Sequence, residues 1–136
     1  MTTQVDQGFV EWMSDKSFLV VEDVSSSRLL EASLLRGLGA RTVVTAVDGA
    51  DAVSKLESGA TQPDIIICDW LMPGLDGIGV LEHAKRLIPG IKVVMVTSKS
   101  GLEDAKLAHD KGADGYVAKP FTRETLLAVL KRLRGV

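Results

Sequence analysis

Hydrophobic and polar positions follow two alternating patterns along this chain. Short, nearly continuous apolar runs are typical of strands buried on both faces, and the stretches between them repeat apolar positions three and four residues apart, as amphipathic helices do. The predicted strands are residues 18–21, 42–46, 65–69, 93–96 and 115–118. The predicted helices bury, in turn, Leu29, Leu30, Leu34 and Leu38; Ala52, Val53 and Leu56; Val80, Leu81, Ala84 and Leu87; and the apolar sides of residues 102–111 and 123–134.

The alternation of strand and helix, with short connections, predicts an α/β fold: a doubly wound, five-stranded parallel sheet with helices on both faces. Right-handed crossovers leave few arrangements, and the flavodoxin-like order 2-1-3-4-5 places strands 1 and 3 side by side. In such sheets ligands bind beyond the carboxyl ends of the strands, where the winding direction reverses. The residues that follow the strands are therefore the first place to look for chemistry.

The helix after the first strand has predicted ends as well as a predicted face. Ser25, Ser26 and Ser27 offer side chains that can cap its N-terminus. Gly39 is expected to end it, because glycine readily adopts the backbone conformation that stops a helix.

The first 16 residues form a segment of a different kind, polar except for a few apolar side chains. Val5, Phe9, Trp12 and Met13 fall on one side of a short amphipathic helix. We interpret residues 1–16 as an N-terminal extension and residues 17–136 as one domain. The extension either folds back or stays disordered as a tail, or forms a helix that docks on the domain or on a partner. Self-association through it would give a weak dimer in place of a monomer.

Composition narrows the class of protein. The 136 residues are 46% hydrophobic and 25% charged, as in a globular domain, and a net charge of −2 provides no general affinity for nucleic acid or anionic membranes. The single Cys68 excludes an internal disulfide and a multi-cysteine metal site. No apolar stretch approaches the roughly 18 residues that span a bilayer, and the acidic N-terminus lacks the apolar core of a secretory signal. We therefore expect a cytoplasmic protein without nucleic-acid or membrane partners.

The predicted sheet brings polar side chains together at its carboxyl edge. They are Glu22 and Asp23 after strand 1, Asp69 after strand 3, Thr97 and Ser98 after strand 4, and Lys119 after strand 5. Three carboxylates this close either raise one pKa strongly or hold a cation, and a donor set of oxygen atoms favours Mg²⁺ completed by water and a phosphate. Lys119 can bind phosphate oxygens and the Thr97 hydroxyl can donate to them. The set therefore suits phosphoryl transfer onto Asp69.

Four segments carry a resemblance to a known family. They are VVEDVSSSR (residues 20–28), DWLMPGLDG (69–77), VMVTSKS (94–100) and GYVAKPFT (115–122). Any one of them is a weak signal, but all four stand in order at predicted strand ends. Over residues 17–134 the chain resembles the receiver domain of two-component response regulators, and is especially similar to the single-domain, chemotaxis-type (CheY-like) regulators.

The resemblance implies a role for each residue of the cluster. Asp69 matches the phosphoacceptor, and Asp23 matches the direct ligand of Mg²⁺. Glu22 matches the acid that holds the ion through water, and the backbone carbonyl of Leu71 occupies the main-chain ligand position. Lys119 matches the lysine that binds the phosphoryl group.

The resemblance also implies a conformational switch. Thr97 matches the switch hydroxyl, and Tyr116 matches the aromatic residue whose rotamer follows the movement of Thr97 toward the phosphoryl group. Leu71 and Lys99 match positions that tune how readily water attacks the acyl phosphate. Because leucine cannot orient a water molecule and the stem of Lys99 can shield one side, we expect slow autodephosphorylation.

The implied partners are a histidine kinase or histidine phosphotransfer protein, which donates the phosphoryl group, and a downstream protein that binds the switched form. The family commonly binds through its helix 4–strand 5–helix 5 face, where Lys99, Lys106, Tyr116 and Thr122 are expected to lie. On this interpretation the protein is a signalling switch that catalyses its own phosphorylation and slow dephosphorylation, not an enzyme. A chemotaxis pathway rests on overall similarity alone.

Three other functions compete with this interpretation. A phosphatase of the haloacid-dehalogenase type needs a second acid two residues after the nucleophile, where this chain has Leu71. A nucleotide- or flavin-binding domain needs a glycine-rich loop after the first strand, where Glu22 and Asp23 would repel phosphate. A phosphorylation-independent interaction module of receiver fold usually lacks one of the core residues, and none is missing from this sequence.

Overall fold

The computed structural model of the protein describes residues 6–98, 101–120 and 122–135. Its strands are β1 (Ser17–Val21), β2 (Thr42–Ala46), β3 (Ile65–Asp69), β4 (Lys92–Thr97) and β5 (Gly115–Ala118). Its helices are α1 (Gln7–Ser14), α2 (Ser25–Gly37), α3 (Gly49–Ser58), α4 (Gly77–Leu87), α5 (Leu102–Asp110) and α6 (Arg123–Arg134). Each predicted strand is present, with ends within a residue of those expected.

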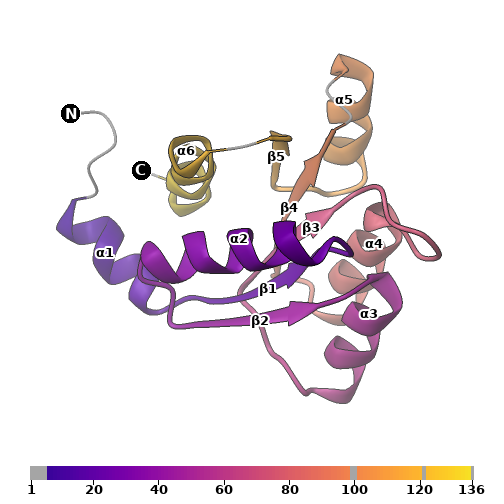
Figure 1. The fold of residues 1–136 in the computed structure, drawn as a ribbon, viewed down its shortest axis with the longest axis horizontal. Helices are drawn as coiled ribbons and strands as arrows, with labels where there is room; N and C mark the ends of the chain where they lie inside the picture. The colour runs from indigo at the N-terminus through magenta and orange to yellow at the C-terminus, as the bar shows by residue number, and fades with distance from the viewer. Residues whose placement is uncertain (1–5, 99–100, 121, 136) are drawn as a thin grey trace.

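The strands form one parallel sheet in the order β2-β1-β3-β4-β5, which confirms the predicted flavodoxin-like fold. Val20 of β1 pairs with Thr45 of β2 and with Ile67 of β3, and Ile67 pairs in turn with Val94 of β4. Because the strands run in the same direction, their carboxyl ends lie along one edge of the sheet (Figure 1).

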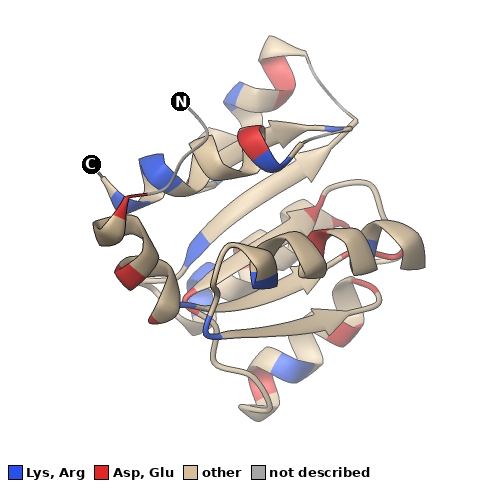
Figure 2. Cartoon of the chain, turned by 60° about the vertical axis from the view of Figure 1, so that its left-hand side comes forward, with Lys and Arg blue, Asp and Glu red and all other residues tan. Residues whose placement is uncertain are grey.

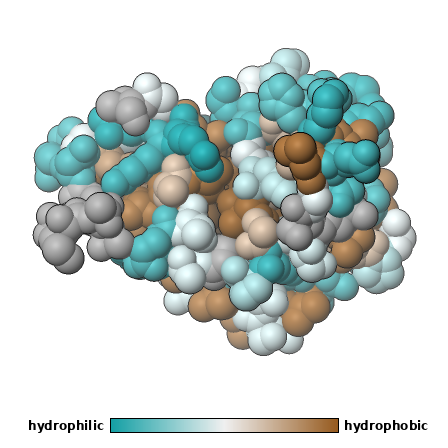
Figure 3. All heavy atoms as spheres, turned by 90° about the horizontal axis from the view of Figure 1, so that it is seen from above, coloured by the Kyte–Doolittle hydropathy of each residue, from teal (hydrophilic) through white to brown (hydrophobic). Residues whose placement is uncertain are grey.

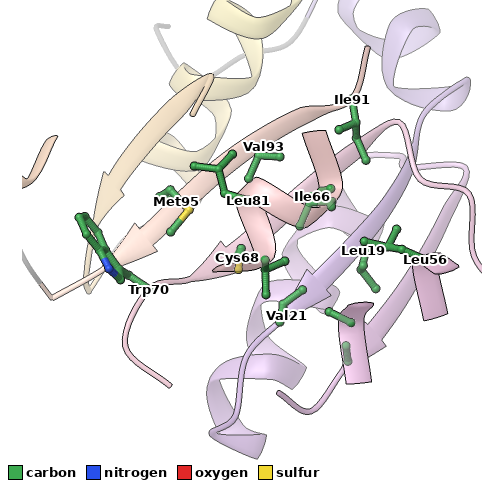
Figure 4. Packing of buried hydrophobic residues seen from close by; sticks show 14 of the residues in the cluster. Leu19, Val21, Leu56, Ile66, Cys68, Trp70, Leu81, Ile91, Val93 and Met95 are labelled. Carbon is green, nitrogen blue, oxygen red and sulfur yellow. The ribbon is translucent and has the colours of Figure 1, made fainter. Parts of the chain in front are cut away.

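Alternate residues of the central strands supply two separate cores. In β3, Ile66 and Cys68 belong to the cluster beneath α3, α4 and α5, which Figure 4 shows from close by. Ile65 and Ile67 belong to the cluster beneath α1, α2 and α6. Every residue of β3 is buried, so the continuous apolar run in the sequence reflects helices on both faces.

The predicted inward face of α2 was wrong by part of a turn. Leu29 and Leu30 are 69% and 55% exposed, and Leu34 is only partly buried. The buried side chains of this segment are Glu31, Ala32, Leu35 and, just beyond the helix, Leu38. The rotation of α2 follows from packing, because Leu35 and Leu38 belong to the core cluster that also contains Val20 and Ile67. At the first turn of α2, the guanidinium of Arg28 donates to the backbone carbonyl of Glu22 at 2.8 Å. Side-chain hydropathy alone does not show which face of α2 packs on the sheet.

Two smaller predictions about helix ends were also wrong. No serine caps α2: its N-cap is Val24, whose N–H donates to the carboxylate of Glu22 at 3.0 Å. Leu87 was expected to be buried but is 42% exposed, because α4 ends there and Ile91 takes the inward position after the turn. The side chain of Glu22, two residues before Val24, thus binds a backbone N–H at the start of α2 where a serine cap was expected.

Helix α1 packs on the far side of the sheet from α3 and α4, beside α6 (Figure 1). Asp6 caps it by accepting from the N–H of Phe9 at 2.7 Å, and Asp6 also lies 3.5 Å from the guanidinium of Arg134. Phe9 and Met13 are fully buried, and Trp12 packs at the margin of the same cluster. Val5 lies outside the described residues. The division into an extension of residues 1–16 and a domain of residues 17–136 stays a prediction.

The surface is mixed in polarity and charge. Figure 2 shows basic and acidic residues interspersed over the helices, and Figure 3 shows hydrophobic patches broken up by hydrophilic ones on the face it displays. Among the described helices, none has the length and hydrophobicity that crossing a membrane requires.

Gly77, the first residue of α4, packs so closely against the end of β3 that we expect a side chain at this position to destabilise the protein. A Cβ atom there would lie 2.4 Å from the backbone oxygen of Asp69 and 2.7 Å from the Cα of Trp70. Because backbone must move to make room, Gly77→Ala should lower the free energy of unfolding by about 1–3 kcal/mol in urea titrations. The matched control is Gly37→Ala in α2, where nothing lies within 4 Å, and it should leave stability unchanged or raise it by up to about 1 kcal/mol. Equal losses in both variants would contradict the steric argument.

Candidate functional site at the carboxyl edge of the sheet

Three carboxylates meet where β1 and β3 end. Val21 and Cys68 pair across the two strands, so the residues that follow them, Glu22 and Asp69, emerge side by side. One oxygen of each of Glu22, Asp23 and Asp69 lies within 4.8 Å of the others. Glu22 is fully buried and Asp69 is 5% exposed, whereas Asp23 is partly exposed. The predicted acidic cluster therefore exists as a group in space.

Lys119 connects this cluster to the other half of the sheet. It follows β5, where its N–H donates to the backbone carbonyl of Thr97 at 2.8 Å. Its ammonium lies 2.6 Å from Oε1 of Glu22 and 3.4 Å from Oδ2 of Asp69. One cation is thus shared unequally between two buried acids, and the shorter contact belongs to Glu22.

Because Lys119 is shared unequally, the pKa values of Glu22 and Asp69 shift in opposite directions. Burial, and then the charge of Glu22, raise the pKa of Asp69 to about 6 from an ordinary 3.8, and Lys119 offsets only part of this rise. Burial also opposes ionisation of Glu22, but hydrogen bonds from Lys119 and from the N–H of Val24 hold its pKa below its ordinary value. Burial lowers the pKa of Lys119, but its hydrogen bond to Glu22 and the charge of Asp69 outweigh burial and raise it. Of the two acids that share Lys119, Asp69 is therefore the one whose charge is less compensated by the protein.

The predicted switch residues lie on the neighbouring strands. Thr97 is fully buried at the end of β4, in the strand whose Val96 pairs with Asp69. Tyr116 of β5 is half-buried, and its ring meets that of Trp70 edge-on, with 6.3 Å between ring centroids. Burial and the nearby charge of Asp104 raise the pKa of Tyr116. The aromatic contact joins β5, which carries the predicted switch residue Tyr116, to Trp70, the residue directly after Asp69.

The tuning and output residues are placed as follows. Leu71 is 51% exposed beside the acidic cluster, whereas Lys99 lies outside the described residues. The family's helix 4–strand 5–helix 5 face corresponds to α5–β5–α6 in this chain, because α1 precedes the first strand. On this face, Lys106 is exposed and pairs with Asp110 at 3.3 Å. Thr122 is the N-cap of α6, so its hydroxyl is already engaged with the N–H of the third helical residue. Their roles in partner binding stay predictions.

The donor set fits a hard divalent cation. All the clustered atoms are carboxylate oxygens, and Lys119 leaves the charge of three acids only partly neutralised. A cation bound among Glu22, Asp23 and Asp69 would supply the missing compensation. The residues present therefore suit Mg²⁺.

Sequence reasoning missed one buried acid near this site. Glu31 of α2 is 2% exposed, and burial, together with the charge of Glu22, raises its pKa to about 8. The signal was present: Glu31 shares its helical spacing with Leu35 and Leu38, and it would have been noticed had the inward face of α2 been assigned correctly.

The family model of the response regulator receiver domain matches residues 18–131. The chain belongs to this family, as its resemblance predicted. Receiver domains are signalling switches that bind Mg²⁺ at an acidic pocket, and the cluster of Glu22, Asp23 and Asp69 corresponds to such a pocket.

Among curated proteins, the chain is similar to chemotaxis protein CheY-3 of Vibrio cholerae, with 35% identity over 117 residues that cover 85% of this chain and 88% of CheY-3. It is also similar to protein PilG of Pseudomonas aeruginosa, with 36% identity over 115 residues and 83% of each chain covered.

Solved structures give the same result. The chain superposes with a TM-score of 0.83 on the CheX-CheY-BeF3-Mg+2 complex from Borrelia burgdorferi, at 25% identity and with 89% and 90% of the two chains covered. For the receiver domain of sensor histidine kinase PA1611 from Pseudomonas aeruginosa, with magnesium in its active-site cleft, the TM-score is 0.76 at 29% identity, with 89% and 98% covered.

Proposed function

We propose that this protein is a single-domain response regulator that accepts a phosphoryl group from a histidine kinase or histidine phosphotransfer protein onto Asp69, in a Mg²⁺-dependent reaction. The observation that carries the proposal is the contact between Lys119 and the buried Asp69, with 3.4 Å between ammonium and carboxylate, beside two further acids. Similarity to CheY-3 and PilG, along 88% and 83% of their lengths, supports the proposal.

The proposed reaction is attack by Asp69, whose negative charge is only partly compensated by Lys119, on the phosphoryl group of the donor. Its carboxylate attacks the phosphorus in line, an acyl phosphate bond forms, and the P–N bond to the donor imidazole breaks with its electron pair passing to the leaving nitrogen. Asp23 and Asp69 would hold Mg²⁺ directly, Glu22 through water and Leu71 through its backbone carbonyl. When bound, the ion supplies positive charge to the phosphoryl oxygens. Lys119 donates a hydrogen bond to the same oxygens from its place between two acids.

The proposed switch connects the phosphoryl group to Tyr116. Thr97 moves to donate its hydroxyl to the phosphoryl oxygens, and Tyr116 turns inward behind it. Moving a population from about 1:99 to 99:1 requires about 5.5 kcal/mol, and full burial of a tyrosine ring supplies at most about 4–6 kcal/mol. Because Tyr116 is already half-buried, the hydrogen bond of Thr97 must contribute the remainder.

The switched form is proposed to bind a downstream protein through the α5–β5–α6 face, with Lys99, Lys106, Tyr116 and Thr122 contributing. The CheX–CheY complex of Borrelia burgdorferi supports protein binding by a relative of this kind. The side chain of Lys106 is 76% exposed, so we expect it to contribute through charge and not through packing.

Trp70 provides the test of this function, because it adjoins Asp69 and contacts Tyr116. In a Trp12→Phe background, beryllofluoride should produce a saturable change in fluorescence that requires Mg²⁺ and is absent from Asp69→Asn. Acetyl phosphate should produce the same change transiently. A protein that responds to neither compound would instead be a phosphorylation-independent interaction module.

The exposed side chain of Leu71 predicts a slow return to the unphosphorylated state. Leu71→Asn should speed autodephosphorylation several-fold, because an amide can orient the attacking water and leucine cannot. Since Leu71 is half exposed, the substitution should leave the free energy of unfolding within about 0.5 kcal/mol of wild type. Decay of radiolabelled acyl phosphate after removal of the donor measures the effect. Identical decay in both proteins would contradict it.

A further inference from the structure

A cavity of about 350 Å³ lies beside Lys119, on the side of the sheet covered by α2. Lys119 borders both this cavity and the acidic cluster around Asp69, and the charge of Glu22 in that cluster acts on Glu31 in the cavity wall. Among the described residues, its walls are formed by Ser27, Leu30, Glu31, Ser98, Lys119 and Pro120.

Glu31 is the unusual member of these walls. Its side chain is almost completely buried, and its Oε1 atom has no hydrogen-bond partner among the described residues. A carboxyl oxygen in this position accepts a hydrogen bond whether Glu31 is ionised or protonated through its other oxygen. Buried acceptors are ordinarily satisfied, so the site calls for an N–H or O–H donor that the described part of the chain does not provide.

The surroundings favour a donor that carries positive charge. The charged groups that act on Glu31 are Glu22, Lys119 and Asp69, and Lys119 is engaged with both of these acids. The acids outnumber the cation, so the local potential is negative. Leu30 and Pro120 add apolar surface to the same walls.

We propose that this cavity binds a small organic cation that donates an N–H to Oε1 of Glu31 and rests its apolar body against Leu30 and Pro120. Binding itself does not depend on phosphorylation. If the proposed function holds, an occupant beside Lys119 will also slow phosphoryl transfer to Asp69, which would make the cavity an inhibitory site.

Benzamidine is a suitable probe, because it joins an amidinium to a flat apolar ring. In an NMR titration of the whole chain without Mg²⁺ or phosphodonor, it should shift the backbone amide signals of Ser27, Glu31 and Ser98 saturably. Benzoate, which has the same shape and the opposite charge, should not. Glu31→Leu should weaken benzamidine binding at least about tenfold, because it removes the acceptor without removing bulk.

Two further variants keep the result interpretable. Leu30→Ala, an exposed change that should not disturb folding, is expected to weaken binding several-fold by removing apolar contact. Leu29→Ala is the matched control on the same helix, because Leu29 is exposed and is not part of the described walls. It should leave the dissociation constant unchanged.

Several results would overturn the proposal: equal binding of benzoate, full-strength binding to Glu31→Leu, absence of saturable shifts, or a crystal structure in which only water contacts Oε1 of Glu31. Failure of phosphorylation would leave the titration unaffected, because the titration contains neither Mg²⁺ nor a phosphodonor. The two proposals can therefore fail independently.

Discussion

Replacing Lys119 with methionine is expected to lower the free energy of unfolding by about 2–4 kcal/mol at about pH 7.5 and to abolish stable phosphorylation of Asp69. The ammonium lies 2.6 Å from the fully buried Glu22, and its removal leaves that carboxylate uncompensated. The loss should fall somewhat below the range for fully buried pairs, because the Lys119 side chain is 24% exposed.

The pH dependence of this loss has a definite sign. In the wild type the pKa of Glu22 is held below its ordinary 4.5, so its ionised form contributes stability above that pH, and the contribution is lost as pH falls. The penalty of Lys119→Met should therefore shrink toward about pH 4, where Glu22 can become neutral. Urea titrations across this range measure it.

Lys106→Met is the matched control for Lys119→Met. Lys106 is 76% exposed and pairs with Asp110 within one helix, so its replacement should change the free energy of unfolding by no more than about 0.5 kcal/mol. If Lys119→Met were as stable as this control at neutral pH, the shared ammonium would not be holding the site together.

Replacing Asp69 with asparagine is expected to stabilise the protein while abolishing phosphoryl acceptance. The pKa of Asp69 is raised to about 6 from 3.8, so the stability associated with its neutral form is complete below about pH 3.8 and is lost as pH rises through about 6. A difference of about two pKa units corresponds to at most about 3 kcal/mol. Asp69→Asn should therefore gain about 1–3 kcal/mol at about pH 8 and little at about pH 4.

Chemical unfolding at these two pH values, with a chelator present, tests the prediction. Asp15→Asn is the control, because Asp15 is 77% exposed and its removal should change stability by less than about 0.5 kcal/mol. Added Mg²⁺ should stabilise the wild type more than Asp69→Asn, since the variant lacks one proposed ligand. A variant less stable than wild type at high pH would show that Asp69 is adequately compensated in the folded protein.

The sequence by itself determined the architecture and the composition of the acidic edge. Ile65 to Cys68 form a run that only a strand covered on both faces can bury, and such strands alternate with amphipathic helices. A parallel sheet of this kind brings its carboxyl ends to one edge by geometry alone. The sequence therefore predicts that Glu22, Asp69 and Lys119 lie together.

The tertiary structure alone decided how the helices are turned and how charge is divided. Leu29 and Leu30 have the hydropathy of core residues, yet Glu31 occupies an inward position, because Leu35 and Leu38 of the same face pack into the core beneath α2 with residues of β1 and β3. Distances decided that Lys119 favours Glu22 over Asp69. Periodicity reports which residues share a helix face, but the choice of buried face and the strength of an ion pair depend on contacts between residues distant in sequence.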